Sequence, residues 1–239
     1  MGSLAPQLAS VATIAHPAPA WFETHTRRME RTAFASGDPA EAIRQAGQNA
    51  SIGRDESLFC EGDPADAVFV VVSGTVRLSK MLADGRRQII GFHEAGDLIG
   101  FALSQEHSYS AEAVTSARLR RVSRTKLEGL MDANPQLRLS LFSLAARELA
   151  AAQRQLLLLG RKTARERLCS FLVERRRDGS GTIELPMSRT DIADYLGLTI
   201  ETVSRTLSQL RSAGLIRMQG LNSIELADPE RLYDMAEAA

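Results

Sequence analysis

The chain has 239 residues, of which 44% are apolar and 24% charged, values typical of globular proteins with a hydrophobic core. Twenty-nine basic residues balance twenty-nine acidic ones, so net charge alone indicates neither a nucleic acid nor a membrane as partner. No run of 18 apolar residues is present, and no Lys or Arg precedes Arg27, so neither a membrane-spanning helix nor a secretory signal is expected. Two cysteines cannot form a disulfide framework. These features predict a cytoplasmic protein of one or two domains without a membrane partner.

Charge is distributed unevenly along the chain. Residues 41–112 hold eleven acidic and six basic side chains, whereas residues 161–219 hold eleven basic and seven acidic ones. This asymmetry indicates two modules, of which the second, basic one binds a polyanion. Ordinary scatter of solvated surface charge is the alternative interpretation.

The N-terminal part carries few signals of regular structure. Residues 1–26 are rich in Ala, Pro and Ser, and their prolines oppose helices and strands, so a flexible extension is expected. Residues 27–50 have a loosely helical spacing with a weak apolar face.

Short strands are predicted from Ser57 onward. Residues 67–72 are β-branched and aromatic, and residues 76–81 alternate between apolar and polar. Asp84-Gly85 predicts a hairpin turn, because glycine tolerates the positive φ of such turns. Further strands are expected at 88–92, 97–100, 109–114 and 118–122. Many short, closely spaced strands are typical of a β-barrel or sandwich.

A long helix is predicted from Asn134 to Leu159. Asn134-Pro135 is typical of an N-cap followed by proline in the first turn, and Gly160 is expected to end the helix and act as a hinge. Six side chains follow the alternating three- and four-residue spacing of a coiled-coil seam: Phe142, Ala145, Leu149, Ala152, Leu156 and Leu159. We interpret this seam as the dimerisation surface of a homodimer, and a core helix packed on its own strands is the alternative.

Residues 188–210 have the pattern of a helix-turn-helix. Ser188 and Asp191 resemble a capping box, Gly197 predicts the turn, and Thr199 can cap the second helix. The second helix is expected to turn Val203, Leu207 and Leu210 inward and Glu201, Ser204, Arg205 and Ser208 outward.

The outward face suits the reading of a DNA major groove. Arg205 can donate to O6 and N7 of guanine, Glu201 can accept from N4 of cytosine, and Ser204 adds a polar or methylene contact. Phosphate contacts are expected from Ser188, Arg189, Thr199 and Thr202, and Thr190 and Ile200 complete the predicted DNA-binding set. The apolar stretches 215–218 and 223–226 predict a wing hairpin. Double-stranded DNA is therefore the expected partner.

Three segments resemble the cyclic-AMP receptor protein and fumarate–nitrate reduction regulator (CRP/FNR) family of bacterial transcription factors. They are residues 62–74, residues 84–100 and the recognition-helix segment 199–205. The resemblance implies an α+β fold with a cyclic-nucleotide-binding-like β-roll (a double-stranded β-helix), a long dimerisation helix and a C-terminal winged helix-turn-helix. The domains it implies are a flexible extension (1–26), the β-roll with flanking helices (27–133), the dimerisation helix (134–160) and the DNA-binding domain (161–239).

The recognition segment favours one branch of that family. Glu201-Thr-Val-Ser-Arg205 after Ile200 resembles the FNR and FixK type, since cyclic-AMP receptors carry a second Arg at the position of Ile200. The resemblance implies a homodimer on a TTGA-N6-TCAA-like palindrome that activates genes of low-oxygen or nitrogen-related metabolism. It also implies a contact between barrel loops around 84–87 and RNA polymerase, for which a solvated turn is the simpler interpretation.

The positions that family members use for effectors are altered. Cyclic-nucleotide binders carry a Glu and an Arg-Ser pair where this chain has Phe101 and Tyr109-Ser110, so cyclic AMP is not expected to bind in the usual way. FNR proteins hold an iron–sulfur cluster on four cysteines, and this chain has only Cys60 and Cys169. We therefore expect no cofactor and no metal, as in the FixK-like branch.

Several alternatives stay open at this point. Both cysteines are expected to be buried and inert, but Arg165, one helical turn from Cys169, would lower the pKa of a redox-active thiol there. A ligand-gated regulator whose β-roll binds an unidentified small molecule or haem is the alternative function. An enzyme is not expected, because His93 lacks the second histidine of a cupin site and Gly160-Arg-Lys-Thr163 lacks the earlier glycine of a phosphate loop.

Overall fold

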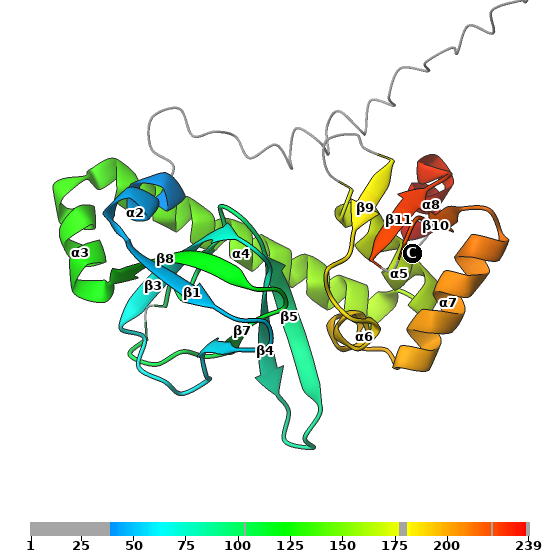
Figure 1. The fold of residues 1–239 in the computed structure, drawn as a ribbon, viewed down its shortest axis with the longest axis horizontal. Coiled ribbons are helices and arrows are strands. Elements are labelled where there is room, and N and C mark those ends of the chain that lie inside the picture. Colours follow the sequence, from blue (N-terminus) through cyan, green and yellow to red (C-terminus); the bar gives the residue numbers. More distant parts are fainter. Residues whose placement is uncertain (1–38, 103, 177–180, 221, 238–239) are drawn as a thin grey trace, which may run out of the picture.

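The computed structural model describes residues 39–102, 104–176, 181–220 and 222–237, so the expected extension at 1–26 lies outside the described residues. A strand-rich part and a mainly helical part lie at the two ends of one long helix, α4 (Pro135–Arg161) (Figure 1). No helix in these ranges is long and apolar enough to cross a membrane.

The N-terminal part is a β-roll of two four-stranded antiparallel sheets, with strand orders β1-β8-β3-β6 and β2-β7-β4-β5. The strands are β1 (Gln48–Ile52), β2 (Ser57–Phe59), β3 (Ala67–Ser73), β4 (Val76–Met81), β5 (Arg87–His93), β6 (Leu98–Ile99), β7 (Ser110–Ala113) and β8 (Ala117–Ser123). Six of them, β3 to β8, confirm the strands predicted from hydrophobic patterning. The α+β fold class is likewise confirmed.

Strand β3 is buried on both faces, which explains its uninterrupted run of apolar residues. Phe69 and Val71 point into the core between the two sheets. Val68 and Val70 point the other way, into a core shared with helices α2 (Pro39–Ala46), α3 (Arg124–Ala133) and α4. Strand β3 therefore joins the β-roll to the long helix.

Of residues 27–50, for which a loosely helical spacing was predicted, residues 27–38 lie outside the described residues, and the prediction holds for only part of the rest. It is correct for α2 but wrong for β1, a strand with the polar sequence Gln-Asn-Ala-Ser-Ile. Strand β1 lies at a sheet edge and pairs antiparallel with β8, Ala50 opposite Leu119. Pairing with a strand almost 70 positions away, and not local propensity, places it in the sheet.

Helix α4 begins where the sequence predicts. The Asn134 side chain accepts hydrogen bonds from the backbone N–H groups of Gln136 and Leu137, at 3.1 and 3.3 Å. The prediction that Gly160 ends the helix is wrong by one residue, since α4 continues to Arg161 and Lys162 is its C-cap.

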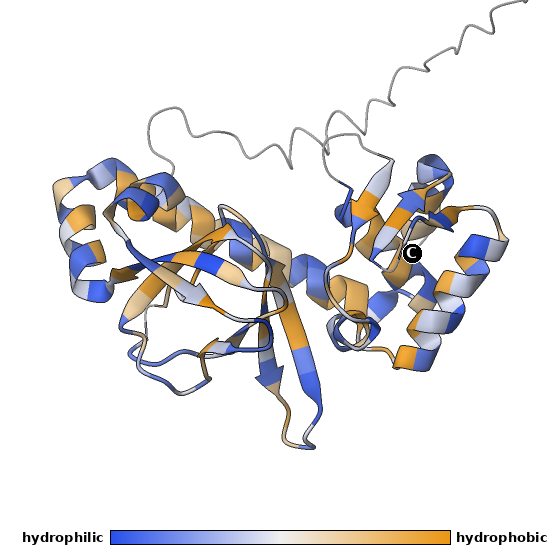
Figure 2. Ribbon diagram, in the orientation of Figure 1, coloured by the Kyte–Doolittle hydropathy of each residue, from blue (hydrophilic) through white to orange (hydrophobic). Residues whose placement is uncertain are grey.

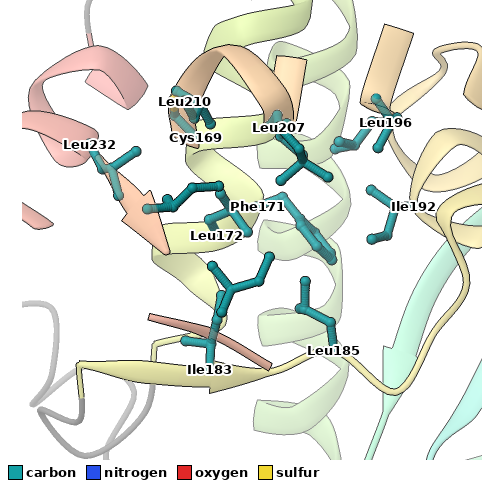
Figure 3. Close-up of a cluster of buried hydrophobic side chains, with 14 of the residues drawn as sticks. Cys169, Phe171, Leu172, Ile183, Leu185, Ile192, Leu196, Leu207, Leu210 and Leu232 are labelled. Atoms are coloured by element: carbon teal, nitrogen blue, oxygen red, sulfur yellow. The ribbon is translucent and has the colours of Figure 1, made fainter. Parts of the chain in front are cut away.

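The C-terminal part consists of α5 (Ala164–Glu174), β9 (Thr182–Glu184), α6 (Arg189–Leu196), α7 (Ile200–Ser212), β10 (Ile216–Met218), β11 (Ser223–Leu226) and α8 (Pro229–Glu237). Strands β10 and β11 confirm the predicted wing hairpin, and the sequence analysis did not identify β9 and α8. Phe171 and Leu172 of α5 lie among Ile183, Leu185 and Ile192 in the core (Figure 3). Because α6 and α7 both contribute side chains to this core, it fixes the position of one helix relative to the other.

Candidate nucleic-acid interface

Local hydrogen bonds define the helix-turn-helix. Ser188 Oγ accepts from the N–H of Asp191 at 3.0 Å, and the Asp191 carboxylate accepts from the N–H of Ser188 at 3.0 Å, which confirms the capping box. Gly197 follows α6 in the left-handed conformation, with φ of 61°, which favours glycine. Thr199 Oγ1 accepts from the N–H of Thr202 at 3.2 Å and so begins α7.

Helix α7 has one buried and one exposed face, as predicted. Val203, Leu207 and Leu210 are buried in the core of the C-terminal part. Glu201, Ser204, Arg205 and Ser208 are exposed, and Figure 2 shows hydrophilic residues along much of this helix. A carboxylate, a hydroxyl and a guanidinium therefore share the outward face within the first two turns of α7.

The predicted phosphate-contacting residues gather at two helix N-termini. Ser188, Thr190, Thr199 and Ile200 are exposed, whereas Arg189 and Thr202 are half-buried. Both N-termini present backbone N–H groups and the positive end of a helix dipole, which suits phosphate oxygens. Ser188 Oγ already donates to Asp191 Oδ2 at 2.8 Å, so the adjacent backbone N–H groups are the better phosphate donors.

An apolar stripe runs along the exposed side of α4. Phe142, Leu149 and Leu156 are 76%, 62% and 72% exposed, and Ala145 and Ala152 between them are also exposed. Leu139 and Leu157 extend the exposed apolar surface beyond the predicted seam.

Leu159, the last residue of the seam, lies elsewhere. It is half-buried and packs against the core of the C-terminal part, close to Gly197. A β-carbon added at Gly197 would lie 3.3 Å from Leu159 Cδ2, so glycine also provides room at the turn.

The interior of the β-roll contains an aromatic cluster. His107 stacks on Phe59 with ring centroids 3.6 Å apart, and Tyr109 lies 5.7 Å from the same ring. Burial lowers the pKa of His107 and raises that of Tyr109, so neither side chain is charged near pH 7. Phe101 packs instead on the core shared with the helices. Phe101 and Tyr109 were predicted from the sequence, whereas the contact between Phe59 and His107 was not, because it joins residues far apart in the chain.

The two cysteines differ in environment. Cys60 is exposed, so the expectation that it is buried is wrong. Cys169 is buried, and burial raises the pKa of its thiol to about 11, an effect that the nearby Arg165 only partly opposes. A thiolate at Cys169 is therefore disfavoured, and the basis for a redox role there is lost. Within the described ranges, no cluster of three His, Cys, Asp or Glu side chains could hold a metal ion.

Comparison with known proteins agrees with this two-part arrangement. Residues 50–134 match the cyclic nucleotide-binding domain, and residues 166–235 match the Crp-like helix-turn-helix domain. A β-roll, a long helix and this DNA-binding motif define a DNA-binding transcriptional regulator, and not an enzyme. The chain belongs to the CRP/FNR family.

Several relatives carry the FixK name. The nitrogen fixation regulation protein FixK of Azorhizobium caulinodans is 43% identical over 229 residues, which are 91% of this chain and 90% of that protein. The transcriptional activatory protein AadR of Rhodopseudomonas palustris is 40% identical over 204 residues, 83% of this chain and 85% of AadR. The structure of FixK2 from Bradyrhizobium japonicum is similar with a TM-score of 0.77 and 44% identity, over 81% of this chain and 98% of that one.

Proposed function

We propose that this protein binds a TTGA-N6-TCAA-like palindrome as a homodimer and activates genes of low-oxygen or nitrogen-related metabolism. The observation that carries the proposal is the joint exposure of Glu201, Ser204 and Arg205 on the first two turns of α7. The names of the FixK proteins and of AadR support activation and the nitrogen-related targets.

In this proposal the homodimer forms along α4, within residues 134–160. The exposed stripe of Phe142, Leu149 and Leu156 is unfavourable in water, and a second copy of the same helix would cover it. The alanines between these large side chains allow close approach of the two backbones. Such a two-fold dimer should place the two α7 helices about one turn of DNA, roughly 34 Å, apart, as in other helix-turn-helix dimers.

Each base and phosphate contact has an assigned side chain or backbone group. Arg205 donates to guanine, Glu201 accepts from cytosine, and Ser204 adds a polar or methylene contact. The N-termini of α6 and α7 bind phosphates, assisted by Arg189 and by the hydroxyls of Thr190 and Thr202. Thr199 and Ile200, the N-cap and the first residue of α7, are exposed beside these groups.

RNA polymerase is the proposed second partner. Met81, the last residue of β4, and Leu82, the first residue of the β4–β5 turn, are 61% and 43% exposed and support a protein contact there. Arg86 lies in the turn and pairs with Asp84, whereas Arg87 binds α6, so the turn at 82–86 is the part of the hairpin left for a partner.

Fluorescence anisotropy tests the proposal. The purified protein is titrated in air, without added ligand, onto a TTGA-N6-TCAA duplex and a scrambled duplex at one salt concentration. A preference of about 10³-fold or more for the palindrome, the lower end for specific regulators, is the expected result. Equal and weak binding to both duplexes contradicts the proposal and favours a ligand-gated regulator.

A further inference from the structure

An ionic contact joins the β-roll to the first helix of the helix-turn-helix. Strand β5 lies against α6. Arg87 Nη2 donates to Asp191 Oδ1 at 2.7 Å, and Arg87 Nε donates to Asp194 Oδ2 at 2.8 Å. The two carboxylates lie on α6, more than 100 positions from Arg87. One guanidinium therefore spans two carboxylates of the other domain.

A second arginine of the β-roll reaches the same carboxylate. Arg77, on β4, has its Nη1 3.3 Å from Asp191 Oδ1, and its Nη2 lies 2.6 Å from Glu112 Oε1. The side chains of Arg77 and Asp191 are only 8% and 4% exposed. Burial of these charges is tolerated because each has partners, and loss of one partner leaves another charge uncompensated.

Asp191 also belongs to the capping box of α6. Its carboxylate accepts from the N–H and from Oγ of Ser188 while it binds the two arginines. The same carboxylate thus defines the N-terminus of α6 and attaches that terminus to the β-roll. The predicted phosphate-binding groups begin at this terminus.

Further contacts hold the other end of α6. The Tyr195 carbonyl accepts from Gln88 Nε2 at 3.3 Å and from Gln155 Nε2 at 2.8 Å. The Phe92 and Tyr195 rings lie 5.5 Å apart. Separately from α6, the C-cap of α5 contacts the β-roll, since Arg175 Nη1 binds Glu94 Oε1 at 2.6 Å. Helix α6 is therefore attached at both ends to the β-roll and α4, and the core it shares with α7 transmits its position to the recognition helix.

We propose that Arg77 and Arg87 are positioning residues for DNA recognition. They hold α6, and through it α7, in the orientation that binds DNA, and they do so without an effector. The inference rests on the proposed function. Only Lys162 and Thr163 connect α4 to α5, and both have extended backbone angles, so the covalent link alone is a poor constraint on the DNA-binding part. The packing of Leu159 on the C-terminal core and the hydrogen bond from Gln155 to Tyr195 constrain it as well, and the ionic contact adds the link to the β-roll.

Arg87→Met and Arg86→Met form a matched pair for the test. Arg87→Met keeps most of the side-chain stem and removes both contacts to α6. Arg86→Met makes the same change one residue earlier, where the arginine is exposed and, among the residues that the structure describes, forms its ion pair with Asp84 in its own turn. Arg87 is itself partly exposed, so its loss should leave both domains folded.

The first readout is hydrogen exchange of the α6 amides in the free protein. Arg87→Met should accelerate exchange in α6 while Arg86→Met leaves it unchanged, because only the first variant removes contacts to α6. This measurement needs no DNA, so it tests whether Arg87 stabilises α6 even if the protein does not bind the proposed palindrome. Equal exchange in the two variants would overturn the inference.

The second readout is affinity for the palindromic duplex at one salt concentration. Arg87→Met should weaken binding by about tenfold relative to Arg86→Met, a size typical of coupling between adjacent groups. Arg87→Lys, which keeps the charge, should recover part of the loss. Asp194→Asn should have less effect in the Arg87→Met background than alone, because the two residues share one contact. Unchanged affinity, or tighter binding by Arg87→Met, would refute the positioning role.

Discussion

The imidazole of His107 lies flat against the ring of Phe59, with centroids 3.6 Å apart and planes inclined by 12°. Tyr109 tilts against the same ring, and its hydroxyl accepts from the N–H of Gly100 at 3.3 Å. Three uncharged rings therefore lie together in the β-roll, and one of them, Tyr109, stands where the sequence resemblance implies the arginine of cyclic-nucleotide binders. A cyclic phosphate would find no cation among these three rings.

Cyclic AMP should not change the behaviour of this protein. We expect no shift in the melting temperature and no change in affinity for the palindrome at about millimolar nucleotide, since tight binding to the folded state would raise both. Differential scanning fluorimetry and anisotropy measure these quantities. A clear rise of the melting temperature with nucleotide concentration would mean that the aromatic cluster rearranges.

Arg205→Ala should weaken binding at a cognate site by about 1–3 kcal/mol and relax the preference for guanine at one position. The reason is that the variant lacks the two guanidinium N–H donors that hydrogen-bond to O6 and N7 of guanine. The measurement is the affinity of the variant for four duplexes that carry each of the four bases at that position. Arg211→Ala, an exposed arginine in the last turn of the same helix, is the matched control and should change affinity equally for all sequences. If Arg205→Ala keeps the same preference for guanine at that position, Arg205 does not have the proposed role in base recognition.

Leu149→Asp should produce monomers that bind the full palindrome poorly. Leu149 is 62% exposed in the isolated chain, so a carboxylate there costs the monomer little but would be buried in the proposed dimer. Light scattering gives the mass, and anisotropy gives the affinity. Gln136→Asp adds the same charge in the first turn of α4 and should remain dimeric. A dimeric Leu149 variant would show that the subunits meet elsewhere.

Cys169 should reduce stability at alkaline pH. Burial raises the pKa of its thiol in the folded state to about 11 from an ordinary value of about 9, so between these pH values only the unfolded chain loses the proton. Stability is therefore present below about pH 9 and falls as the pH rises towards 11, by at most about 3 kcal/mol from this group. Denaturant unfolding of Cys169→Ala should show a smaller fall over this range.

The control for this prediction is the exposed cysteine. Cys60→Ala should keep the alkaline loss of stability seen in the parent chain, because the buried thiol remains. The same two variants show which cysteine reacts with a thiol reagent. We expect Cys60 to react in the folded protein and Cys169 to react only after unfolding. An identical pH profile for all three proteins would show that Cys169 contributes nothing.

Features that depend on residues close together in the chain were predictable. Asn134 caps α4, Ser188 and Asp191 form the capping box, and Gly197 makes the turn, since each needs partners within about four positions. The two faces of α7 also follow from helical periodicity alone. For this reason the helix-turn-helix, the part that contacts DNA in our proposal, was predicted residue by residue.

Features that depend on distant partners were decided only by the tertiary structure. Strand β1 has a polar sequence and forms because β8 offers it a free edge. Leu159 leaves the seam because the C-terminal part packs against it, and Arg87 reaches Asp191 across 104 positions. Local periodicity determined strands β3 to β8, the wing hairpin and the two faces of α7, and motif resemblance determined the family. The packing of the DNA-binding part on the β-roll determined which charged side chains form ion pairs. These pairs could not be predicted, because a contact between residues far apart in the chain leaves no pattern in the local sequence.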